Sequence, residues 1–419
     1  MPGEVQLNVQ TNKSMFPVTG GQQLVYVLIE ALPTGAVANV RMPLNFSLVL
    51  DHSGSMSGKK ITSLKEAAKL AVGRMGTQDV VSVVVFDDKV KVVAPSQQVT
   101  DPAGLKRQID QIRDGGGTKM SRGLRKGLEE LRKGLSPGRV NRMILLTDGE
   151  TFGDEEVCRR LAAEASRQDI PIIALGLGEE WNEQLLDDIA KASGGTSDFI
   201  PEGRPEAVLN TFEYQVLAAQ AAVVQNAELI LRLVPGVMPR AVWRVTPLIT
   251  KLGHRALSDR DVQVTLGDMD REQGQSVLVE MLISPRQPGA YRIAQAEVSY
   301  DVAAAGLIGE KAKSDIVLDF TSDPAQAKQT NPYVMNIIEM VTAHKLQTRA
   351  LDEAAVGNIA GATQKLRAAA TRLLELGEDE LAQTATEEAD RLERGGKISA
   401  QGTKKLRYET RKLTQKLVD

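Results

Sequence analysis

Cysteine and histidine are scarce in this chain of 419 residues, which contains one cysteine, Cys158, and three histidines. A single thiol excludes an intramolecular disulfide and any zinc site built from several thiolates. The histidines His52, His254 and His344 lie far apart along the chain, and three scattered residues are too few for a convincing zinc site. These counts exclude a disulfide scaffold and disfavour zinc chemistry.

The chain also lacks an excess of positive charge and is poor in aromatic residues. Its formal net charge is -3, and aromatic residues make up 4% of the sequence. It therefore has neither an overall basic surface for a nucleic-acid backbone nor much material for stacking bases. Hydrophobic residues at 42% and charged residues at 25% are typical of a soluble globular protein. We therefore predict a folded protein of two to four domains that does not bind nucleic acid.

Long apolar runs are missing as well. The first 14 residues, MPGEVQLNVQTNKS, are polar and do not have the basic and apolar parts of a secretory signal. No stretch approaches the roughly 18 apolar residues of a membrane-spanning helix. A single free thiol fits a reducing compartment. The sequence predicts a cytoplasmic protein with no membrane span.

The composition and the spacing of apolar residues change along the chain. Residues 1–43 and 221–320 contain β-rich runs separated by Gly, Pro and Asp, whereas residues 44–220 alternate short apolar strands with amphipathic helices. Residues 321–419 show helical spacing of apolar residues, typical of two to four antiparallel helices. We predict an antiparallel β-sandwich from 1–43 with 221–320, because two N-terminal strands cannot form a sandwich alone. A doubly wound, mainly parallel, Rossmann-like α/β domain of residues 44–220 would interrupt it, and 321–419 would form a C-terminal helical domain.

Oxygen-bearing side chains follow the first strand of the α/β region. Asp51, Ser53 and Ser55 come where the apolar strand LNFSLVL ends and before a helix that starts near Ile61. Open α/β sheets bind ligands at the carboxyl ends of their strands. Carboxylate and hydroxyl oxygens suit Mg²⁺, Mn²⁺ or Ca²⁺ rather than zinc or copper.

Two further oxygen groups occupy equivalent positions. Thr118 follows the glycines at 115–117 just before a helix, and Asp148 ends the strand MILLT. All five side chains are expected on loops above one edge of the sheet. Five groups, of which two are carboxylates, would leave a bound ion with an open electrophilic position. The small set of mostly neutral ligands favours Mg²⁺ over Ca²⁺, which takes more ligands.

This ordered set resembles the metal-ion-dependent adhesion site (MIDAS) of the von Willebrand factor A (VWA) domain. The family pattern is D-x-S-x-S, then a distant Thr and a distant Asp, and this chain has DHSGS at 51–55, GGGT at 115–118 and LLTDGE at 145–150. The match covers about residues 44–200. The wider arrangement is similar to inter-alpha-trypsin-inhibitor heavy chains and to bacterial proteins with such domains.

The resemblance implies a doubly wound sheet with six main strands and a specific division of roles. Ser53 and Ser55 would contact the metal directly, and Thr118 directly or through water. Asp51 and Asp148 would act largely through water and hydrogen bonds. An acidic residue of a protein partner would fill the remaining coordination position.

One glycine-containing segment and several single residues near the motifs allow other interpretations. GSMSGKK superficially looks like a phosphate loop, but its glycines stand one residue too close together and Lys60 occupies the place of the magnesium-binding hydroxyl. Cys158 is predicted to be a buried apolar side chain. Asp87 and Asp88 are predicted to form a turn. Phe152, near Asp148, is a candidate for the rim of a partner surface.

Three functions are compatible with these features. The first, which we favour, is a non-enzymatic, metal-dependent protein-interaction module in an intracellular, bacterial-type signalling or assembly complex. The second is a scaffold that docks through its C-terminal helices, with the metal only bracing the fold. The third is a metal-assisted hydrolase, for which Glu150 and Asp154 are the nearest spare acids. The sequence leaves the partner and the oligomeric state open.

Overall fold

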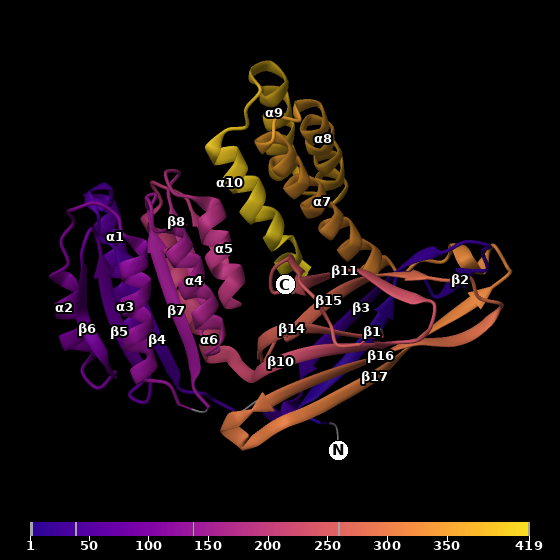
Figure 1. Ribbon diagram of the computed structural model, residues 1–419, viewed down its shortest axis with the longest axis horizontal. Coiled ribbons are helices and arrows are strands. Elements are labelled where there is room, and N and C mark those ends of the chain that lie inside the picture. Colours follow the sequence, from indigo (N-terminus) through magenta and orange to yellow (C-terminus); the bar gives the residue numbers. More distant parts are fainter. Residues whose placement is uncertain (1–2, 38–39, 137, 259, 418–419) are drawn as a thin grey trace. The chain divides into compact units, whose positions relative to one another are not determined.

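The computed structural model describes residues 3–37, 40–136, 138–258 and 260–417. The chain divides into two compact units, residues 41–222 and residues 1–40 together with 223–419 (Figure 1). In the part of the chain that the structure describes, no helix is both long and apolar enough to cross a membrane.

The unit of residues 41–222 is built on one six-stranded sheet. Its strands follow the order β6 (Val90–Gln98), β5 (Val80–Phe86), β4 (Leu44–Asp51), β7 (Val140–Thr147), β8 (Ile172–Leu177) and β9 (Ser197–Ile200). All neighbours are parallel except the antiparallel pair β5 and β6. Every residue of β4 is buried, which is why this central strand is almost continuously apolar.

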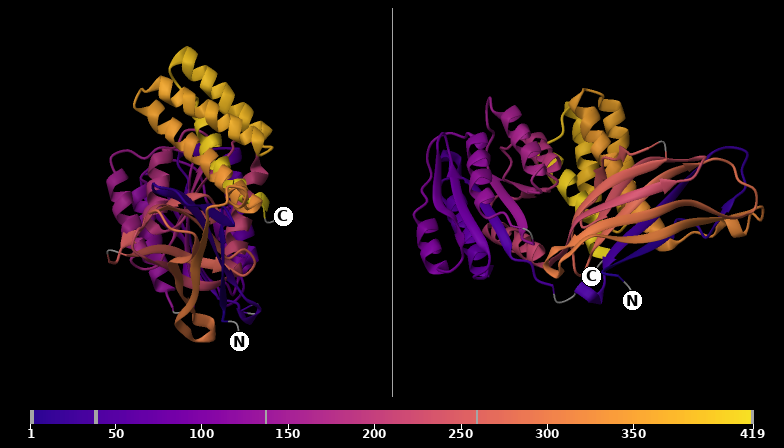
Figure 2. Two further views of the ribbon diagram at one scale, coloured as in Figure 1. Left: turned by 90° about the vertical axis from the view of Figure 1, so that its right-hand side faces the viewer. Right: turned by 60° about the horizontal axis from the view of Figure 1, so that its bottom comes forward.

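Helices cover both faces of this sheet (Figures 1 and 2). They are α1 (Lys59–Arg74), α2 (Pro102–Asp110), α3 (Met120–Lys133), α4 (Glu155–Ser166), α5 (Glu183–Ser193) and α6 (Pro205–Ala221). Helix α1 contacts α2 and α6, whereas α4 contacts both α3 and α5. Right-handed crossovers account for the two layers, because the chain runs from β4 toward β5 in one direction and from β7 toward β9 in the other. The direction reverses between β4 and β7, and this reversal creates the crevice in which open α/β sheets bind ligands.

Two glycines let α3 lie close against the sheet. A Cβ atom at Gly123 would come within 2.5 Å of a ring carbon of Phe86, and one at Gly127 within 2.3 Å of Val49. Any larger residue would push the helix away from the strands. The close approach fixes the start of α3, and therefore the loop before it, beside the ends of β4 and β5.

The second unit contains two β-sheets. One has the order β1 (Val5–Thr11), β3 (Gln23–Pro33), β15 (Gln275–Ile283), β11 (Val237–Thr246) and β12 (Thr250–Leu252). The other has the order β13 (Arg255–Ala256), β14 (Asp261–Asp270), β10 (Ala222–Leu233), β16 (Gly289–Val302), β17 (Leu307–Thr321) and β2 (Met15–Pro17). Apolar residues of both sheets form one shared core.

Four C-terminal helices, α7 (Pro332–Ala355), α8 (Ile359–Glu375), α9 (Asp379–Gly395) and α10 (Ala400–Glu409), belong to the same unit. Side chains point alternately to the two faces of a β-strand, and this explains how the helices attach to a sheet. In β3, Val27 and Ile29 face the core between the sheets, whereas Leu28 joins a second core formed with the helices. Short 3₁₀ segments lie at Gly35–Val37, Gly54–Met56, Ala303–Ala305, Gln326–Lys328 and Thr410–Leu417.

The predicted α/β fold and the predicted C-terminal helical segment are confirmed, but the sequence pattern did not indicate the edge strands β6 and β9. Strand β6 carries Pro95 and is largely exposed, and β9 has four residues. Edge strands need no apolar residues on both faces and tolerate proline, so their sequences lack the signal of a buried strand.

Candidate metal centre

The ends of β4 and β7 bring the first side chains of the site together. Asp51 ends β4, and Thr147 ends the neighbouring parallel strand. Thr147 Oγ1 donates a hydrogen bond to Asp51 Oδ2 at 2.5 Å, and the Ser53 amide donates to Asp51 Oδ1 at 2.8 Å. Asp51 is fully buried, and this burial raises its pKa to about 6 despite both hydrogen bonds, with a further contribution from nearby Asp148. The site thus holds a carboxylate whose negative charge is poorly compensated.

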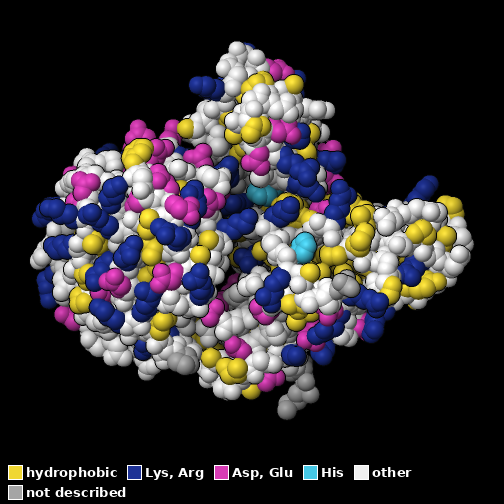
Figure 3. All heavy atoms as spheres, in the orientation of Figure 1, with side chains coloured by type: hydrophobic (Ala, Val, Ile, Leu, Met, Phe, Trp, Pro, Cys, Tyr) yellow, Lys and Arg dark blue, Asp and Glu magenta, His cyan; other side chains and the backbone are white. Residues whose placement is uncertain are grey.

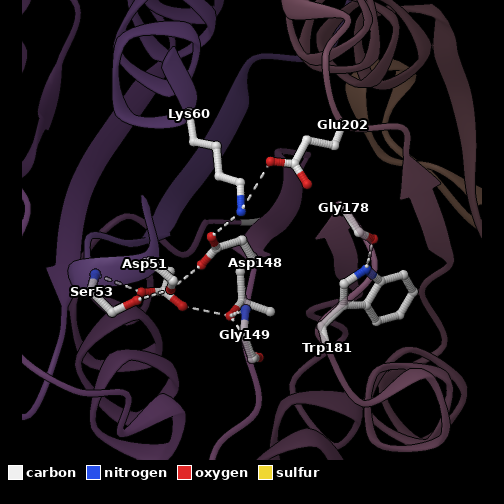
Figure 4. A network of polar contacts seen from close by, with 10 residues as sticks. Asp51, Ser53, Lys60, Asp148, Gly149, Gly178, Trp181 and Glu202 are labelled. Atoms are coloured by element: carbon white, nitrogen blue, oxygen red, sulfur yellow. Dashed lines mark hydrogen bonds and ion pairs between the residues drawn. The ribbon is translucent and has the colours of Figure 1, made fainter. Parts of the chain in front are cut away.

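Two serines, Ser53 and Ser55, lie between this carboxylate and the second one, Asp148. Figure 4 shows Ser53 beside Asp51. Ser53 Oγ lies 3.1 Å from Ser55 Oγ, and Ser55 Oγ donates to Asp148 Oδ1 at 2.7 Å. Asp148 is almost completely buried, with 1% of its surface exposed. A 3₁₀ turn, Gly54–Met56, places the serines, and its buried Met56 anchors it to the core. Contacts between oxygen atoms therefore join Ser53, Ser55 and Asp148, and Asp51 is joined to this set through the Ser53 amide.

Thr118 completes the set from a different loop. A Cβ atom added at Gly149 would lie 3.7 Å from Ser55 Oγ and 3.9 Å from Thr118 Oγ1. Both hydroxyls therefore face the same glycine, which directly follows Asp148. The structure brings together all five residues that the sequence singled out.

The glycine loop before Thr118 is held by the turn after β5. The Gly117 amide donates to Asp88 Oδ2 at 2.8 Å, and the Lys119 amide donates to the Asp87 carbonyl oxygen at 2.9 Å. The Gly54 amide also donates to the Gly116 carbonyl oxygen at 3.0 Å, which ties this loop to the serine turn. The sequence predicted only a turn at residues 87–88, so this positioning role was missed.

Lys60, in the first turn of α1, also belongs to the site (Figure 4). Its Nζ atom lies 2.8 Å from Asp148 Oδ2 and 3.6 Å from Glu202 Oε1. Burial disfavours the ammonium ion, but Asp148 and, to a smaller degree, Glu202 together outweigh this effect and raise the pKa of Lys60 above its usual value. Lys60 and Thr147 were not predicted as site residues, although both are polar residues beside the recognised motifs.

The chemistry of the donor set fits a magnesium ion. Octahedral Mg²⁺ holds oxygen ligands at 2.0–2.1 Å, so neighbouring ligands stand about 3 Å apart. The two measured oxygen separations along Ser53, Ser55 and Asp148 are 3.1 and 2.7 Å. Within the described ranges, no group of three or more His, Cys, Asp or Glu residues could hold a metal, so hydroxyl ligands are required. Asp51, Ser53, Ser55, Thr118 and Asp148 could supply them.

Nearby reactive groups are committed elsewhere. Burial alone would raise the pKa of Asp154. Hydrogen bonds from Ser121 and Thr151 have a larger combined effect in the opposite direction, so the pKa of Asp154 lies below its usual value. Cys158 is buried, and burial raises the pKa of its thiol far above the ordinary range. Phe152 is 69% exposed, and its carbonyl oxygen accepts a hydrogen bond from Lys119 Nζ at 2.5 Å. Only Phe152 offers a free apolar surface among these three residues.

Comparisons with known proteins agree with the fold. A family model described as von Willebrand factor type A domain matches residues 45–206, and one described as Sll0103-like, C-terminal alpha-helical domain matches residues 332–416. A Synechocystis protein designated sll0103 is 33% identical over 269 residues, which are 64% of this chain and 63% of that protein. Inter-alpha-trypsin inhibitor heavy chain H3 from Rattus norvegicus is 30% identical over 165 residues, which are 37% of this chain and 19% of the heavy chain. The chain therefore spans less than two thirds of either relative.

Two solved structures are similar over nearly the whole chain. A von Willebrand factor type A protein from Catenulispora acidiphila superposes with a TM-score of 0.79 at 19% identity. The superposition covers 98% of this chain and 96% of the Catenulispora chain. The ArnB paralog VWA2 from Sulfolobus acidocaldarius superposes with a TM-score of 0.59 at 16% identity, with 97% and 99% covered. At these identities the likeness concerns the fold. The family model, by its match to residues 45–206, shows that these residues form a von Willebrand factor type A domain.

Proposed function

We propose that this protein is a divalent-metal-dependent protein-interaction module. Mg²⁺, or Mn²⁺ or Ca²⁺ in its place, would be held by Asp51, Ser53, Ser55, Thr118 and Asp148, and a Glu or Asp side chain of a protein partner would occupy the remaining position. VWA domains generally mediate metal-dependent protein interactions, and the chain contains such a domain at residues 45–206.

One observation carries this proposal: five oxygen-bearing side chains from three separate loops converge at the point where the strand order reverses. Two buried carboxylates, Asp51 and Asp148, lie within this set, and the three hydroxyls around them are neutral. Two buried carboxylates so close together cost free energy unless cations compensate both of them, and Lys60 pairs with Asp148. A divalent ion supplies that compensation and, with so few anionic ligands, keeps its affinity for a further carboxylate.

The surroundings of the site support binding to a protein surface. Exposed Phe152 stands four residues after Asp148 and offers an apolar contact next to the metal position. On the face shown in Figure 3, basic and acidic side chains are interspersed over the unit that Figure 1 colours indigo to magenta. No field of one sign dominates that face.

Binding is better supported than hydrolysis. A metal-assisted hydrolase needs a base within hydrogen-bond reach of the attacking water. Asp154, one of the two nearest spare acids, accepts hydrogen bonds from the Ser121 amide at 2.9 Å and from Thr151 Oγ1 at 2.5 Å, and it holds the start of α3. Its lowered pKa makes it a poor base.

We also propose the domain organisation that the sequence suggests: a β-domain from residues 1–43 and 221–320, a VWA domain at 44–220 and a helical domain at 321–419. The division of contacts near residues 40 and 222 supports the two inner boundaries. The helices share a core with β3, β11 and β15, which supports a role in bracing the β-domain as well as in docking. The cytoplasmic location remains a prediction of the sequence.

The experiment that tests the function compares the wild-type chain with Asp51→Ala and Ser53→Ala. Mn²⁺ binding is measured by electron paramagnetic resonance, and protein partners are captured from a lysate in Mg²⁺ or in EDTA. We expect one Mn²⁺ ion per wild-type chain, a loss of at least 100-fold in affinity for Asp51→Ala, and partners that are released by EDTA. Wild-type protein that binds no Mn²⁺, or partners that stay bound in EDTA and in both variants, would contradict the proposal.

A further inference from the structure

The charges around the candidate metal centre do not balance once a divalent ion is counted. Asp51 and Asp148 contribute two buried negative charges, which a divalent ion neutralises. The hydroxyls of Ser53, Ser55 and Thr118 contribute none. Lys60 then adds one positive charge, with its Nζ atom 2.8 Å from Asp148 Oδ2 and only 19% of its side chain exposed.

Glu202 does not cancel this charge to the same degree. Its carboxylate lies 3.6 Å from Lys60 Nζ, beyond ordinary hydrogen-bond length, and 60% of its side chain is exposed. Solvent screens an exposed carboxylate much more than a buried one. The loaded centre therefore keeps a net positive charge on the side of Lys60 and Asp148.

From this arrangement we propose that Lys60 is a positioning residue with opposite effects on the two ligands of the site: it weakens metal binding and strengthens the binding of the partner's carboxylate. This inference rests on the proposed function. The ammonium ion repels the incoming metal because both are positively charged. It also already engages one oxygen of Asp148. Once the metal is bound, the same charge turns a neutral centre into a cationic one, and a carboxylate from outside is attracted more strongly.

Lys60 also fixes the direction of Asp148. Its ion pair engages Oδ2 and leaves Oδ1 as the acceptor of the Ser55 hydroxyl hydrogen bond at 2.7 Å. The Asp148 carboxylate is therefore held between the Lys60 ammonium ion on one oxygen and the Ser55 hydroxyl on the other. A residue that only stabilised the fold would change the affinities for the metal and for the carboxylate in the same direction. The charge of Lys60 changes these two affinities in opposite directions.

The first test measures Mn²⁺ affinity by electron paramagnetic resonance for the wild type, Lys60→Met, Lys60→Arg and the control Lys59→Met. Lys59 is the exposed neighbouring lysine, so its substitution makes the same chemical change away from the site. We expect Lys60→Met to bind Mn²⁺ about tenfold more tightly, and the two other variants to bind as the wild type does. If Lys60→Met does not fold by circular dichroism, Lys60→Gln, which keeps a donor without the charge, replaces it.

The second test measures how strongly bound Mn²⁺ broadens the methyl proton resonance of acetate, with acetamide as the neutral control probe. At equal metal occupancy, Lys60→Met should lose several-fold of the acetate effect relative to the wild type. Tighter metal binding together with weaker acetate binding supports the inference. Metal affinity that is unchanged or lower in a folded Lys60→Met variant overturns it, while wild-type protein that binds no Mn²⁺ overturns the proposed function itself.

Discussion

The two units of this protein bury carboxylates in contrasting ways. In the unit of sheets and helices, Glu280 is 3% exposed and accepts hydrogen bonds from Trp243 Nε1 at 3.0 Å and Lys345 Nζ at 3.1 Å. Glu297 is ringed by Lys313, Lys311 and Arg232, and these cations lower its pKa, Lys313 most strongly. Each of these acids is compensated by donors or cations of its own chain.

Asp51 of the VWA unit is buried among neutral donors instead. It differs in this from Glu130 and Asp148 of the same unit, which pair with Lys133 and Lys60. Asp51 accepts from Thr147 and Ser53, and its pKa is raised to about 6 by burial, in the opposite direction to that of Glu297. A buried carboxylate whose charge is left without a cation is destabilising on its own. The difference teaches where to expect an external cation: beside a buried carboxylate such as Asp51, whose hydrogen-bond donors Thr147 and Ser53 are neutral.

The largest expected effect on stability at neutral pH comes from Glu280→Gln. This change removes the charge that Lys345 pairs with, and we expect the free energy of unfolding to fall by about 2 kcal/mol, discounted from a fully buried pair because Lys345 is partly exposed. Urea unfolding measures it, with Glu272→Gln in an exposed turn as the matched control. Mn²⁺ affinity should stay as in the wild type. Equal stability of the two variants would show that Glu280 is not a structural ion pair.

Asp148→Asn should lower metal affinity strongly and change stability little, which is the reverse of Glu280→Gln. We expect metal affinity to fall about 100-fold. The free energy of unfolding in EDTA should change by less than about 1 kcal/mol, because the loss of the Lys60 ion pair is offset by the loss of the repulsion between Asp148 and Asp51. Calorimetric Mn²⁺ titration and urea unfolding give the two quantities. A large loss of stability without metal would place Asp148 in the same class as Glu280.

A smaller effect is expected at the turn that holds the glycine loop. Asp88→Ala removes the acceptor of the Gly117 amide, so Thr118 should be less well positioned and metal affinity should fall by about threefold to tenfold. Asp114→Ala, an exposed acid of the same loop, is the control. Calorimetric titration distinguishes them, and equal affinities would mean that Thr118 needs no support from this turn.

The last effect appears only at acidic pH and concerns His344, which lies in the core between the helices and the sheet. Burial, followed by the charges of Arg411 and Arg407, lowers its pKa to about 3. The unfolded chain therefore takes up the proton near its ordinary pKa of about 6.5, while the folded chain does not. Stability from this residue is present above pH 6.5 and is lost as the pH falls toward 3.

We expect His344 to contribute a slope of roughly 1 kcal/mol per pH unit below pH 6. Urea unfolding at several pH values measures it in the wild type and in His344→Asn, with His254→Asn at an exposed position as the control. The slope should be shallower in His344→Asn alone. Parallel slopes in all three proteins would show that His344 is not the group that titrates.

Short-range signals were enough to predict much of this protein. The apolar strand before Asp51, the glycines before Thr118 and the strand before Asp148 each carry their information within a few residues. Because parallel strands place their carboxyl ends along one edge, the alternation of strands and helices brought these three segments together in the prediction. The α/β fold and the C-terminal helices followed from the same local periodicity.

The sequence by itself thus determined the kind of fold and which oxygen-bearing side chains meet at the sheet edge. Only the tertiary structure decided what surrounds them: Lys60 reaches Asp148 across 88 residues of chain, and Thr147 reaches Asp51 across 96. Such contacts leave no periodic trace, because they depend on the direction of single side chains after the strands and helices have packed. The balance of charge at the site is set by those contacts and could not be inferred from the motif alone.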